Sequence, residues 1–539
     1  MIKKNILFLL ILLLASIVRL YSISSPPLFG DEIDVGYQAY SLLHTARDIK
    51  GNFLPFYLDS LAESRAPALI YFTVPSIAIF GLNTFAVRLV PLIFGLLSIV
   101  IFYKLVLLTS KSSVLALYST SVLALSPWHI HYSRTSFELT TLSFFMLMGI
   151  YHLISFIKNN KTSSLYISAI SFAITFYTYN IANIFTPLII LFIFLKNYRV
   201  FTLSRIIKPL LLGIFLTSPV IFSILSGTAA NRFKMISIFN DPAVINKIID
   251  QRTDFTTSDS PLIEKISHNK AIAYTNYFFK NYLQSFSPEL IFLSGDPNPR
   301  HNLPGHGLIL LPLFIPLFYG IKKGHPLFLF WLIISPISSS LTQGGGYHAS
   351  RLFLMVFPLS YFIALGLESL SPILRKAMII ISALFFAMYL HEYFVHYPKA
   401  HFSHWQYGYH QLFVHQPTNA TRVFVSNTKY ESLERFAFFQ QIDPRIIQQS
   451  SDLEKENIIG NLPGFKIEPN IFFINHWPST DSLNEINNIA QTGDVFYLLQ
   501  GKDIPGDMDL TKQPLKGYRT IDTVYYPNGQ IMGQVIEKQ

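Results

Sequence analysis

Long apolar runs set the strongest limit on what this chain can fold into. Many of them reach the roughly 20 residues that an α-helix needs to cross the hydrocarbon core of a bilayer. Charged residues make up only 13% of the chain, about half the share found in soluble domains. We therefore expect a mainly α-helical, polytopic membrane protein with about 11 transmembrane helices. These are expected at residues 5–23, 85–108, 113–128, 137–157, 164–179, 181–195, 207–226, 306–321, 326–342, 351–368 and 374–395.

Basic residues predict the orientation of these helices, because cytoplasmic loops of membrane proteins carry an excess of Lys and Arg. With a cytoplasmic N-terminus, the inside loops and their edges hold Lys3, Lys4, Lys104, Lys111, Lys158, Lys161, Lys196, Arg199, Arg205, Lys208, Lys322, Lys323, Arg375 and Lys376. The short outside loops hold Arg134 and Arg351. We therefore expect residues 24–84, 227–305 and 396–539 on the outer face of the cell membrane.

Composition excludes several classes of partner and site. The net charge of +10 arises mostly from basic residues between apolar runs, so we expect no nucleic-acid partner. The chain contains no cysteine, which excludes disulfides and thiolate metal sites. Lys3-Lys4 before an apolar run resembles a signal sequence without a clear cleavage site, and we interpret it as a signal anchor.

Two domains are expected, with the boundary near residue 398. Residues 1–397 form the membrane domain, and its first outer loop has helical spacing of apolar residues between Ile33 and Leu43. Residues 398–539 form an extracytoplasmic α/β domain of sufficient size for its own core. Its expected elements are strands at 422–426, 470–475 and 494–499, a helix at 430–440, and a hairpin of 523–526 with 530–536. Residues 66–80 are apolar but contain two prolines, which favours a re-entrant or interfacial segment.

A group of carboxylates follows the first apolar run, in Gly30-Asp31-Glu32-Ile33-Asp34. Ionisable residues close to hydrocarbon are costly, so they are candidates for function. The alternative is a solvated loop in which Asp31 caps the next helix.

Arginines on the predicted outer face favour a phosphate-containing substrate. A site on that face has no cytosolic nucleotide, so its activated substrate would be lipid-linked. The planar guanidinium of Arg binds phosphate oxygens in pairs, and the candidates are Arg65, Arg134, Arg300 and Arg351. Headgroup contacts or ion pairs are the alternative for each, and Arg134 could simply pair with Glu138, four residues on.

Carboxylates on the same face suggest a reaction. One of them could deprotonate an acceptor hydroxyl or amine while the anomeric carbon of a sugar loses lipid phosphate. A single displacement of this kind inverts the anomeric centre. Asp31 is the candidate base, with Glu32 or Asp34 orienting it or binding substrate, and the spacing alone does not choose among the three.

The order of these motifs resembles the GT-C glycosyltransferases. It is most similar to family 39, the dolichyl-phosphate-mannose protein mannosyltransferase-like proteins, and to the lipid A aminoarabinose transferase-like group. The resemblance covers about residues 5–395. It rests on Gly30-Asp31-Glu32, Tyr37-Gln38-Ala39-Tyr40, Arg65-Ala66-Pro67, Phe80-Gly81-Leu82-Asn83, Ala86-Val87-Arg88-Leu89, Ser133-Arg134 with Glu138, and His348 with Arg351 before Pro358.

The resemblance implies an inverting transferase that uses a polyprenyl-phosphate sugar and an unidentified protein, lipid or glycan acceptor. Family members carry an acidic base or acceptor-binding residue at the position of Asp31 and Glu32. Relatives also often carry a basic residue followed by two prolines, which Arg65-Ala66-Pro67 matches in part, and a later carboxylate at about the place of Glu138. The expected substrate-binding residues are Asp34, Arg65, Arg134, Glu138, Arg300, His348 and Arg351.

A divalent metal is a further possibility, because some family members coordinate one and others need none. Histidines expected on the outer face are His129, His131, His301, His306 and His348, and His-x-His is a usable ligand spacing. The alternative is interfacial histidines bound to backbone or lipid phosphate.

Three other functions fit the same architecture. A transporter or flippase for a lipid-linked sugar tends to show inverted repeats and polar breaks at mid-membrane, and the sequence shows neither. An oligosaccharyl transferase would move a larger glycan with the help of a metal site. A receptor or scaffold would use residues 398–539 as a binding module.

Overall fold

The computed structural model describes residues 2–60, 64–225, 235–253, 269–414, 420–427, 432–449, 456–457, 462–477, 482–506 and 508–539. Its contacts divide the chain into two compact units, each built from separate stretches of sequence. The helical unit comprises Met1–Tyr21, Ala66–Leu69 and Leu89–Tyr393. The mixed unit comprises Ser22–Arg65, Ile70–Arg88 and Phe394–Gln539.

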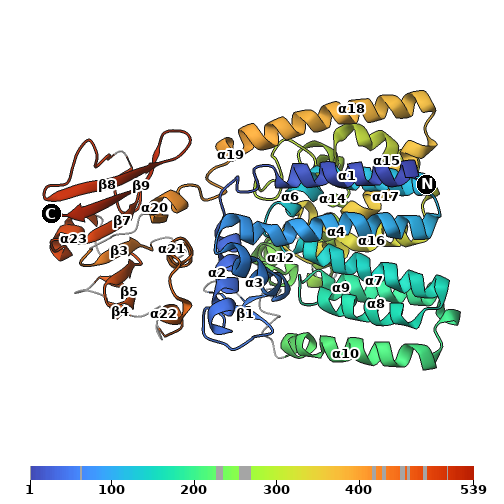
Figure 1. Ribbon diagram of the computed structural model, residues 1–539, viewed down its shortest axis with the longest axis horizontal. Helices are drawn as coiled ribbons and strands as arrows, with labels where there is room; N and C mark the ends of the chain where they lie inside the picture. The colour runs from blue at the N-terminus through green and yellow to red at the C-terminus, as the bar shows by residue number, and fades with distance from the viewer. Residues whose placement is uncertain are drawn as a thin grey trace. The chain divides into compact units, whose positions relative to one another are not determined.

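Apolar helices packed side by side make up the helical unit (Figure 1). Most of them are rich in Leu, Ile, Phe and Val and would expose apolar surface unless they packed against a neighbour or lipid, whereas α6, α12 and α14 are more polar. The helices are α1 (Ile2–Leu20), most of α4 (Thr84–Ser110), whose first turn belongs to the mixed unit, α5 (Ser113–Ala124), α6 (Pro127–Ser133), α7 (Leu139–Asn159), α8 (Thr162–Thr175), α9 (Ala182–Lys196), α10 (Leu203–Leu225), α12 (Pro242–Thr253), α14 (Lys270–Gln284), α15 (Phe314–Gly320), α16 (Pro326–Ser340), α17 (Val356–Ser369) and α18 (Pro372–His391).

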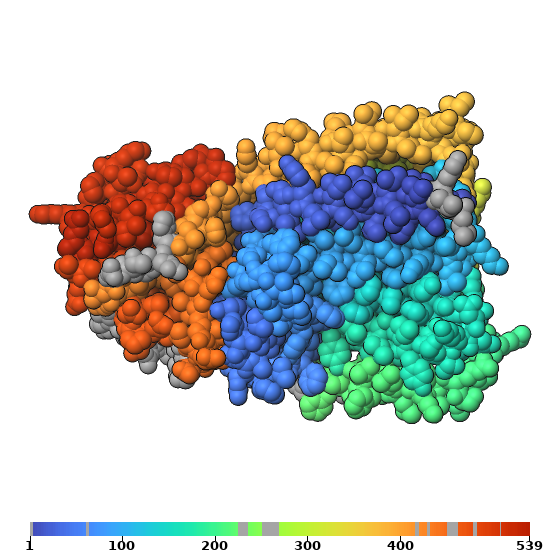
Figure 2. Space-filling model, in the orientation of Figure 1, coloured from blue at the N-terminus to red at the C-terminus, as the bar shows by residue number. Residues whose placement is uncertain are grey.

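The surface of this unit is apolar along α1 and α18, which lie on the outside of the bundle in Figure 2. Leu9 and Leu13 on α1, and Ile380 and Leu384 on α18, each expose more than half of their area. Four of the described helices are long and apolar enough to cross a bilayer, at Thr84–Ser110, Leu139–Asn159, Leu203–Ile224 and Pro372–Ala400. Six shorter helices are also apolar. The protein is a multi-pass membrane protein, as predicted, and the number of crossings stays a prediction.

The mixed unit contains a seven-stranded sheet in the order β4-β5-β6-β3-β7-β9-β8. The central strand β3 is parallel to β6 and β7, and the outer pairs are antiparallel. Stacked Phe424 and Phe496 lie in its core. The strands are β3 (Val423–Ser426), β4 (Glu456–Asn457), β5 (Pro463–Glu468), β6 (Ile471–Ile474), β7 (Val495–Leu499), β8 (Tyr518–Tyr525) and β9 (Ile531–Lys538).

Helices of the same unit come from both ends of the chain. The segment between α1 and α4 contributes α2 (Gly30–Thr45) and most of α3 (Ala68–Phe80), with the short hairpin β1 (Leu58–Asp59) and β2 (Ser64–Arg65). The tail contributes α19 (Tyr397–Ala400), α20 (Tyr409–Val414), α21 (Ser432–Gln440), α22 (Pro444–Gln449) and α23 (Ser482–Ile489). Helix α2 packs against α21 and α22, so the segment between α1 and α4 and the tail share one core.

Most of the expected elements outside the bundle are confirmed. The helix predicted from Ile33 to Leu43 is α2, the three predicted strands are β3, β6 and β7, and the predicted hairpin is β8–β9. Strand β5 was missed, because Pro463 and Gly464 at its start disfavour a strand. The start of the helix predicted at 430–440 lies outside the described residues. The division at residues 397 and 398 stays a prediction.

Candidate functional site

The predicted carboxylates lie in the first turn of α2, beside Arg65 and Arg88. We call Asp31, Glu32, Asp34, Arg65 and Arg88 the carboxylate cluster. Acidic side chains are favourable there, because the first N–H groups of a helix carry partial positive charge. The N-cap is Phe29, in an extended conformation, so the alternative in which Asp31 caps the helix is wrong.

Glu32 is fully buried and paired with Arg88, which is buried too. The guanidinium donates from Nε to Oε1 at 2.8 Å and from Nη2 to Oε2 at 2.6 Å. The remaining donors of Arg88 reach the backbone carbonyls of Ile23, Pro26 and Pro27 at 2.7–3.1 Å. This pair ties the segment before α2 to the start of α4. The sequence placed Arg88 in a motif but gave it no role.

Asp31 and Asp34 share one cation. Arg65 contacts Asp31 Oδ1 through Nη2 at 2.8 Å and forms an ion pair with Asp34 through Nε. Asp34 is 2% exposed, whereas the side chain of Asp31 is 46% exposed. Burial raises the pKa of Asp34, the positive charge of Arg65 opposes that rise, and the negative charge of Asp31 adds to it. Asp31 is therefore the carboxylate of the three that a substrate can reach from solvent.

Residues of the tail hold the start of α2 in place. The backbone N–H of Gly30 donates to Gln406 Oε1 at 2.8 Å, and Arg435 donates to the same oxygen at 2.5 Å. At Gly36 any Cβ would lie 2.7 Å from Phe438 and from Val87, so the close approach requires glycine. The carboxylates therefore stand on a helix that is fixed along its length, which favours a defined geometry.

A second group of polar residues lies in the helical unit, where three separate segments meet. We call Tyr132, Asp296, His301, His348 and Ser350 the histidine cluster. One ligand atom each of Asp296, His301 and His348 lies within 4.8 Å of the others. The sequence predicted His348 for substrate binding and His301 as a metal candidate, but it missed Asp296.

Asp296 joins two of these segments. Its Oδ1 accepts from the N–H of Asn298 at 2.8 Å, and its Oδ2 accepts from the N–H of Ala349 at 2.7 Å. Gly295 before it has φ +74, and a Cβ there would collide with Asn302, so glycine allows the turn that directs Asp296 inward. Burial raises the pKa of Asp296 to about 6, although both N–H donors and Arg351 oppose the rise.

Two of the three predicted arginines of this unit, Arg300 and Arg351, lie on the same segments. Arg351 donates from Nη1 to Thr342 Oγ1 at 2.6 Å and to the carbonyl of Gln343 at 3.1 Å. The carbonyl of Arg300 is bonded to His131 Nε2 at 2.7 Å. The structure brings His301 and His348 together, with ring centroids 4.9 Å apart. The two loops that carry these histidines also carry Arg300, next to His301, and Arg351, three residues after His348.

Arg134 has a different environment. Its Nη1 donates to the carbonyls of Val18, Arg19 and Tyr21 at 2.6–3.1 Å, at the end of α1. Cations are favourable at a helix C-terminus, where carbonyl groups lack partners. Glu138 is 8% exposed and is the residue before α7. These contacts indicate that Arg134 stabilises the helical unit.

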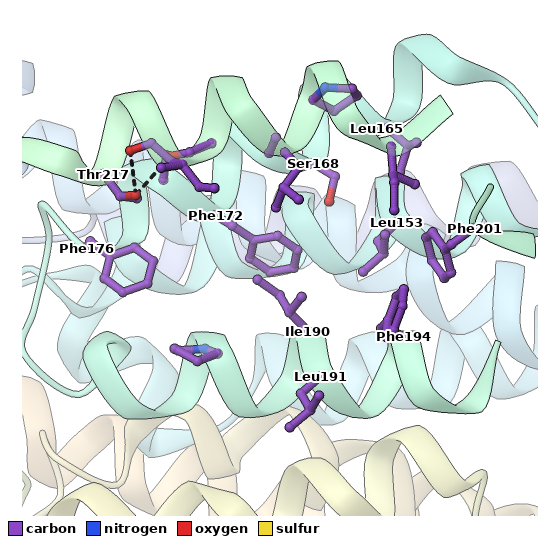
Figure 3. Close-up of a pocket in the computed structure, with 18 residues that line it drawn as sticks. Leu153, Leu165, Ser168, Phe172, Phe176, Ile190, Leu191, Phe194, Phe201 and Thr217 are labelled. Carbon is purple, nitrogen blue, oxygen red and sulfur yellow. Dashed lines mark hydrogen bonds between the residues drawn. The ribbon is translucent and has the colours of Figure 1, made fainter. Parts of the chain in front are cut away.

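An apolar groove of about 570 Å³ lies among α7, α8, α9 and α10. Figure 3 shows Phe172 on α8 facing Ile190 on α9, with the hydroxyl of Thr217 bonded to its own helix. No lining residue is titratable. The groove offers space for hydrocarbon but no group for acid–base chemistry.

Comparisons with known proteins address the fold directly. The family model for dolichyl-phosphate-mannose-protein mannosyltransferase matches residues 64–222. The crystal structure of ArnT from Cupriavidus metallidurans in the apo state has a TM-score of 0.54 at 11% identity, and the alignment covers 98% of this chain and 97% of ArnT. The chain therefore shares the fold of ArnT. ArnT bound to undecaprenyl phosphate aligns with the same TM-score and identity, over 99% of this chain and 97% of ArnT. No curated protein sequence matches significantly.

The fold shared with ArnT bears out the resemblance that the sequence showed over about residues 5–395. The small α/β region at the C-terminus, which the sequence predicted separately, is confirmed as well. The family match contains Arg65, Arg88, Arg134 and Glu138. It leaves out the carboxylates of α2 and the whole histidine cluster apart from Tyr132. Roles for those residues therefore rest on the geometry of this chain.

Proposed function

We propose that this protein is an inverting glycosyltransferase that moves a sugar from a polyprenyl-phosphate donor to an acceptor at the outer face of the membrane. The observation that carries the proposal is the GT-C fold with an accessible carboxylate, Asp31, held by Arg65 at the start of a buried helix. Undecaprenyl phosphate bound to ArnT supports a lipid-phosphate donor. The excess of basic residues in the predicted cytoplasmic loops supports an outer-face reaction, with the N-terminus inside.

In the proposed reaction, Asp31 accepts the proton of an acceptor hydroxyl or amine. The freed oxygen or nitrogen attacks the anomeric carbon of the sugar, and the bond from that carbon to the lipid phosphate breaks. The bonding electrons leave with the phosphate, and the configuration at the anomeric carbon inverts. General base catalysis of this kind contributes about 10²–10⁴-fold to a rate.

The other members of the carboxylate cluster position this base. Arg65 fixes one oxygen of Asp31, and Asp34 holds the other side of the Arg65 guanidinium. Glu32 is enclosed with Arg88, so we assign it to the placement of α2 in preference to contact with substrate. Arg300 and Arg351 remain our candidates for phosphate oxygens, because guanidinium groups bind phosphate well.

The test is transfer of label from radiolabelled polyprenyl-phosphate sugars in proteoliposomes, with envelope lipids and proteins as acceptors. We expect Asp31→Asn to lower transfer about 10²–10⁴-fold without loss of folded protein, because this side chain is half exposed. The matched control is Asp443→Asn, whose side chain is 47% exposed and precedes α22, where Asn caps a helix as well as Asp.

Full transfer by a folded Asp31→Asn protein would remove Asp31 as the base. Absence of transfer by the wild type across several donors would contradict the transferase proposal and favour transport or binding of the lipid-linked sugar.

A further inference from the structure

We propose that Asp296, His301 and His348 form a zinc site in the helical unit. The three residues come from two loops, at residues 294–310 and 344–352, that meet near the end of α6. Their ligand atoms lie within 4.8 Å of one another, and the two imidazole rings have centroids 4.9 Å apart at an angle of 46°. Ligands of a tetrahedral zinc are about 3.3 Å apart, given Zn–N distances of about 2.0 Å. Small side-chain rotations would therefore close the set around an ion.

Hydroxyl groups orient both histidines in the way that metal-binding histidines are usually oriented. The hydroxyl of Tyr132 lies 3.0 Å from His301 Nδ1, and that of Ser350 lies 2.9 Å from His348 Nδ1. Each hydroxyl oxygen can accept a hydrogen bond from Nδ1–H and so favour the tautomer whose Nε2 lone pair binds a metal. We therefore assign Nε2 as the coordinating atom of both rings.

The carboxylate of Asp296 is fixed by hydrogen bonds as well. Asp296 is 5% exposed and receives two backbone N–H groups, one of them from Ala349 next to His348. This bond links the two loops that supply the ligands. A buried carboxylate beside two imidazoles offers one negative charge to a cation, and its oxygens have lone pairs beyond those used by the N–H groups.

The donor set indicates which ion fits. Two imidazole nitrogens with one carboxylate oxygen suit Zn²⁺, whereas Mg²⁺ and Ca²⁺ prefer sets made of oxygen. Three protein ligands leave a fourth position for an oxygen ligand, as in zinc sites that do chemistry. The other histidines of this region have other partners: His129 contacts Arg19 and Ser98, and His131 contacts Tyr393 and the carbonyl of Arg300.

The experiment measures zinc bound to the full chain, purified in detergent with a tag free of histidine. Protein stripped with a chelator is loaded with Zn²⁺ and desalted, and zinc per chain is measured by mass spectrometry. Competition with a fluorescent zinc chelator then measures the dissociation constant. We expect one tightly bound zinc per wild-type chain, and at least 100-fold weaker binding in His301→Ala and in Asp296→Asn. The control is His306→Ala, a half-buried histidine of the same loop, which should bind zinc as the wild type does.

Unfolding of a variant is distinguished by its helical circular dichroism. Where a variant fails to fold, Co²⁺ in the wild type provides a second readout, because a four-coordinate site with nitrogen and oxygen ligands gives intense visible absorption. Wild-type protein without a stoichiometric zinc, or equal binding by wild type, His301→Ala and Asp296→Asn, would overturn the proposal. Zinc content is measured without any transfer reaction, so its outcome is separate from that of the proposed glycosyltransferase.

Discussion

The carboxylate cluster and the histidine cluster stabilise their buried carboxylates with different groups. In the first, the carboxylates are paired within the protein: Arg88 pairs with Glu32, and Arg65 is shared by the other two. Two of the three carboxylates are almost fully buried. In the second, Asp296 is stabilised mainly by backbone N–H groups, and its neighbours are two imidazoles oriented by hydroxyls. The first arrangement is complete without a ligand. The second has the donor atoms to receive a cation.

This difference separates the kinds of chemistry that each cluster can do. A carboxylate such as Asp31, fixed by an arginine and open to solvent, can accept a proton from an acceptor. Imidazoles beside a buried carboxylate can hold a metal ion. The following changes test whether the two clusters differ in this way, beginning with the largest expected effect.

Arg88→Ala removes the cation that serves Glu32 and should cause the largest loss of stability. It leaves a buried carboxylate and several backbone carbonyls without their donor. Breaking such a buried pair from one side costs about 3–5 kcal/mol of folding free energy. The measurement is the thermal unfolding midpoint in detergent.

Arg445→Ala is the matched control for that change. Arg445 is 63% exposed and lies 3.6 Å from Asp443, and surface pairs of this kind contribute about 0–1 kcal/mol. Similar midpoints for the two variants would show that the Arg88 pair is not the internal support that we infer. As long as the Arg88→Ala protein is folded, we expect it to bind zinc as tightly as the wild type does, because the histidine cluster belongs to the other compact unit.

The sequence predicted the three carboxylates of the carboxylate cluster, but it did not predict which of them is accessible to solvent. Asp31, Glu32 and Asp34 are adjacent, so their common location on one helix follows from local spacing. Which of them is accessible depends on Arg88, which is 56 residues from Glu32, and on Arg65, which is 34 residues from Asp31. No pattern in the sequence reports such a pairing, and for this reason Glu32 and Asp31 were predicted to act together.

The histidine cluster depends even more on contacts between residues that are far apart in the sequence. Asp296 meets Ala349 across 53 residues, so its relation to His348 arises only when two loops fold together. The one local signal was the turn of Gly295 followed by Asp296 and Pro297, which marks a constrained backbone. In the mixed unit, strands with continuous apolar residues were predicted correctly, whereas β5 depends on its place at the sheet edge beside β6.

Tyr132→Phe should have an intermediate effect, confined to the histidine cluster. The change removes the hydroxyl bonded to His301 Nδ1 and keeps the ring that packs against it. Loss of an orienting partner of this kind weakens metal binding by about 10–100-fold. The measurement is zinc affinity by chelator competition. The matched control is Tyr37→Phe, which loses a hydroxyl bonded to the carbonyl of Ile442 in the mixed unit and should bind zinc normally. Equal affinity in Tyr132→Phe and the wild type would remove Tyr132 from the support of the site.

The pH-dependent part of the stability change in Asp34→Asn should be the smallest of these effects, and it tests whether burial outweighs the cation of Arg65. Burial raises the pKa of Asp34 above its ordinary value of 3.8, so the folded state binds this proton more tightly than the unfolded state does. Acidification from neutral pH through the raised folded pKa, towards 3.8, should therefore stabilise the wild type relative to Asp34→Asn, which does not titrate. Each pKa unit corresponds to about 1.4 kcal/mol.

The measurement is the difference in unfolding midpoint between the two proteins as a function of pH, which cancels the titration of all other groups. A difference that grows in favour of the wild type on acidification supports burial as the dominant cause. A difference that shrinks would mean that Arg65 lowers the pKa of Asp34 in spite of burial. Asp34 would then be ionised near neutral pH and would pair with Arg65 as a charged group. Both carboxylates that contact Arg65, those of Asp31 and Asp34, would be ionised together, whereas the histidine cluster has a single carboxylate beside its two imidazoles.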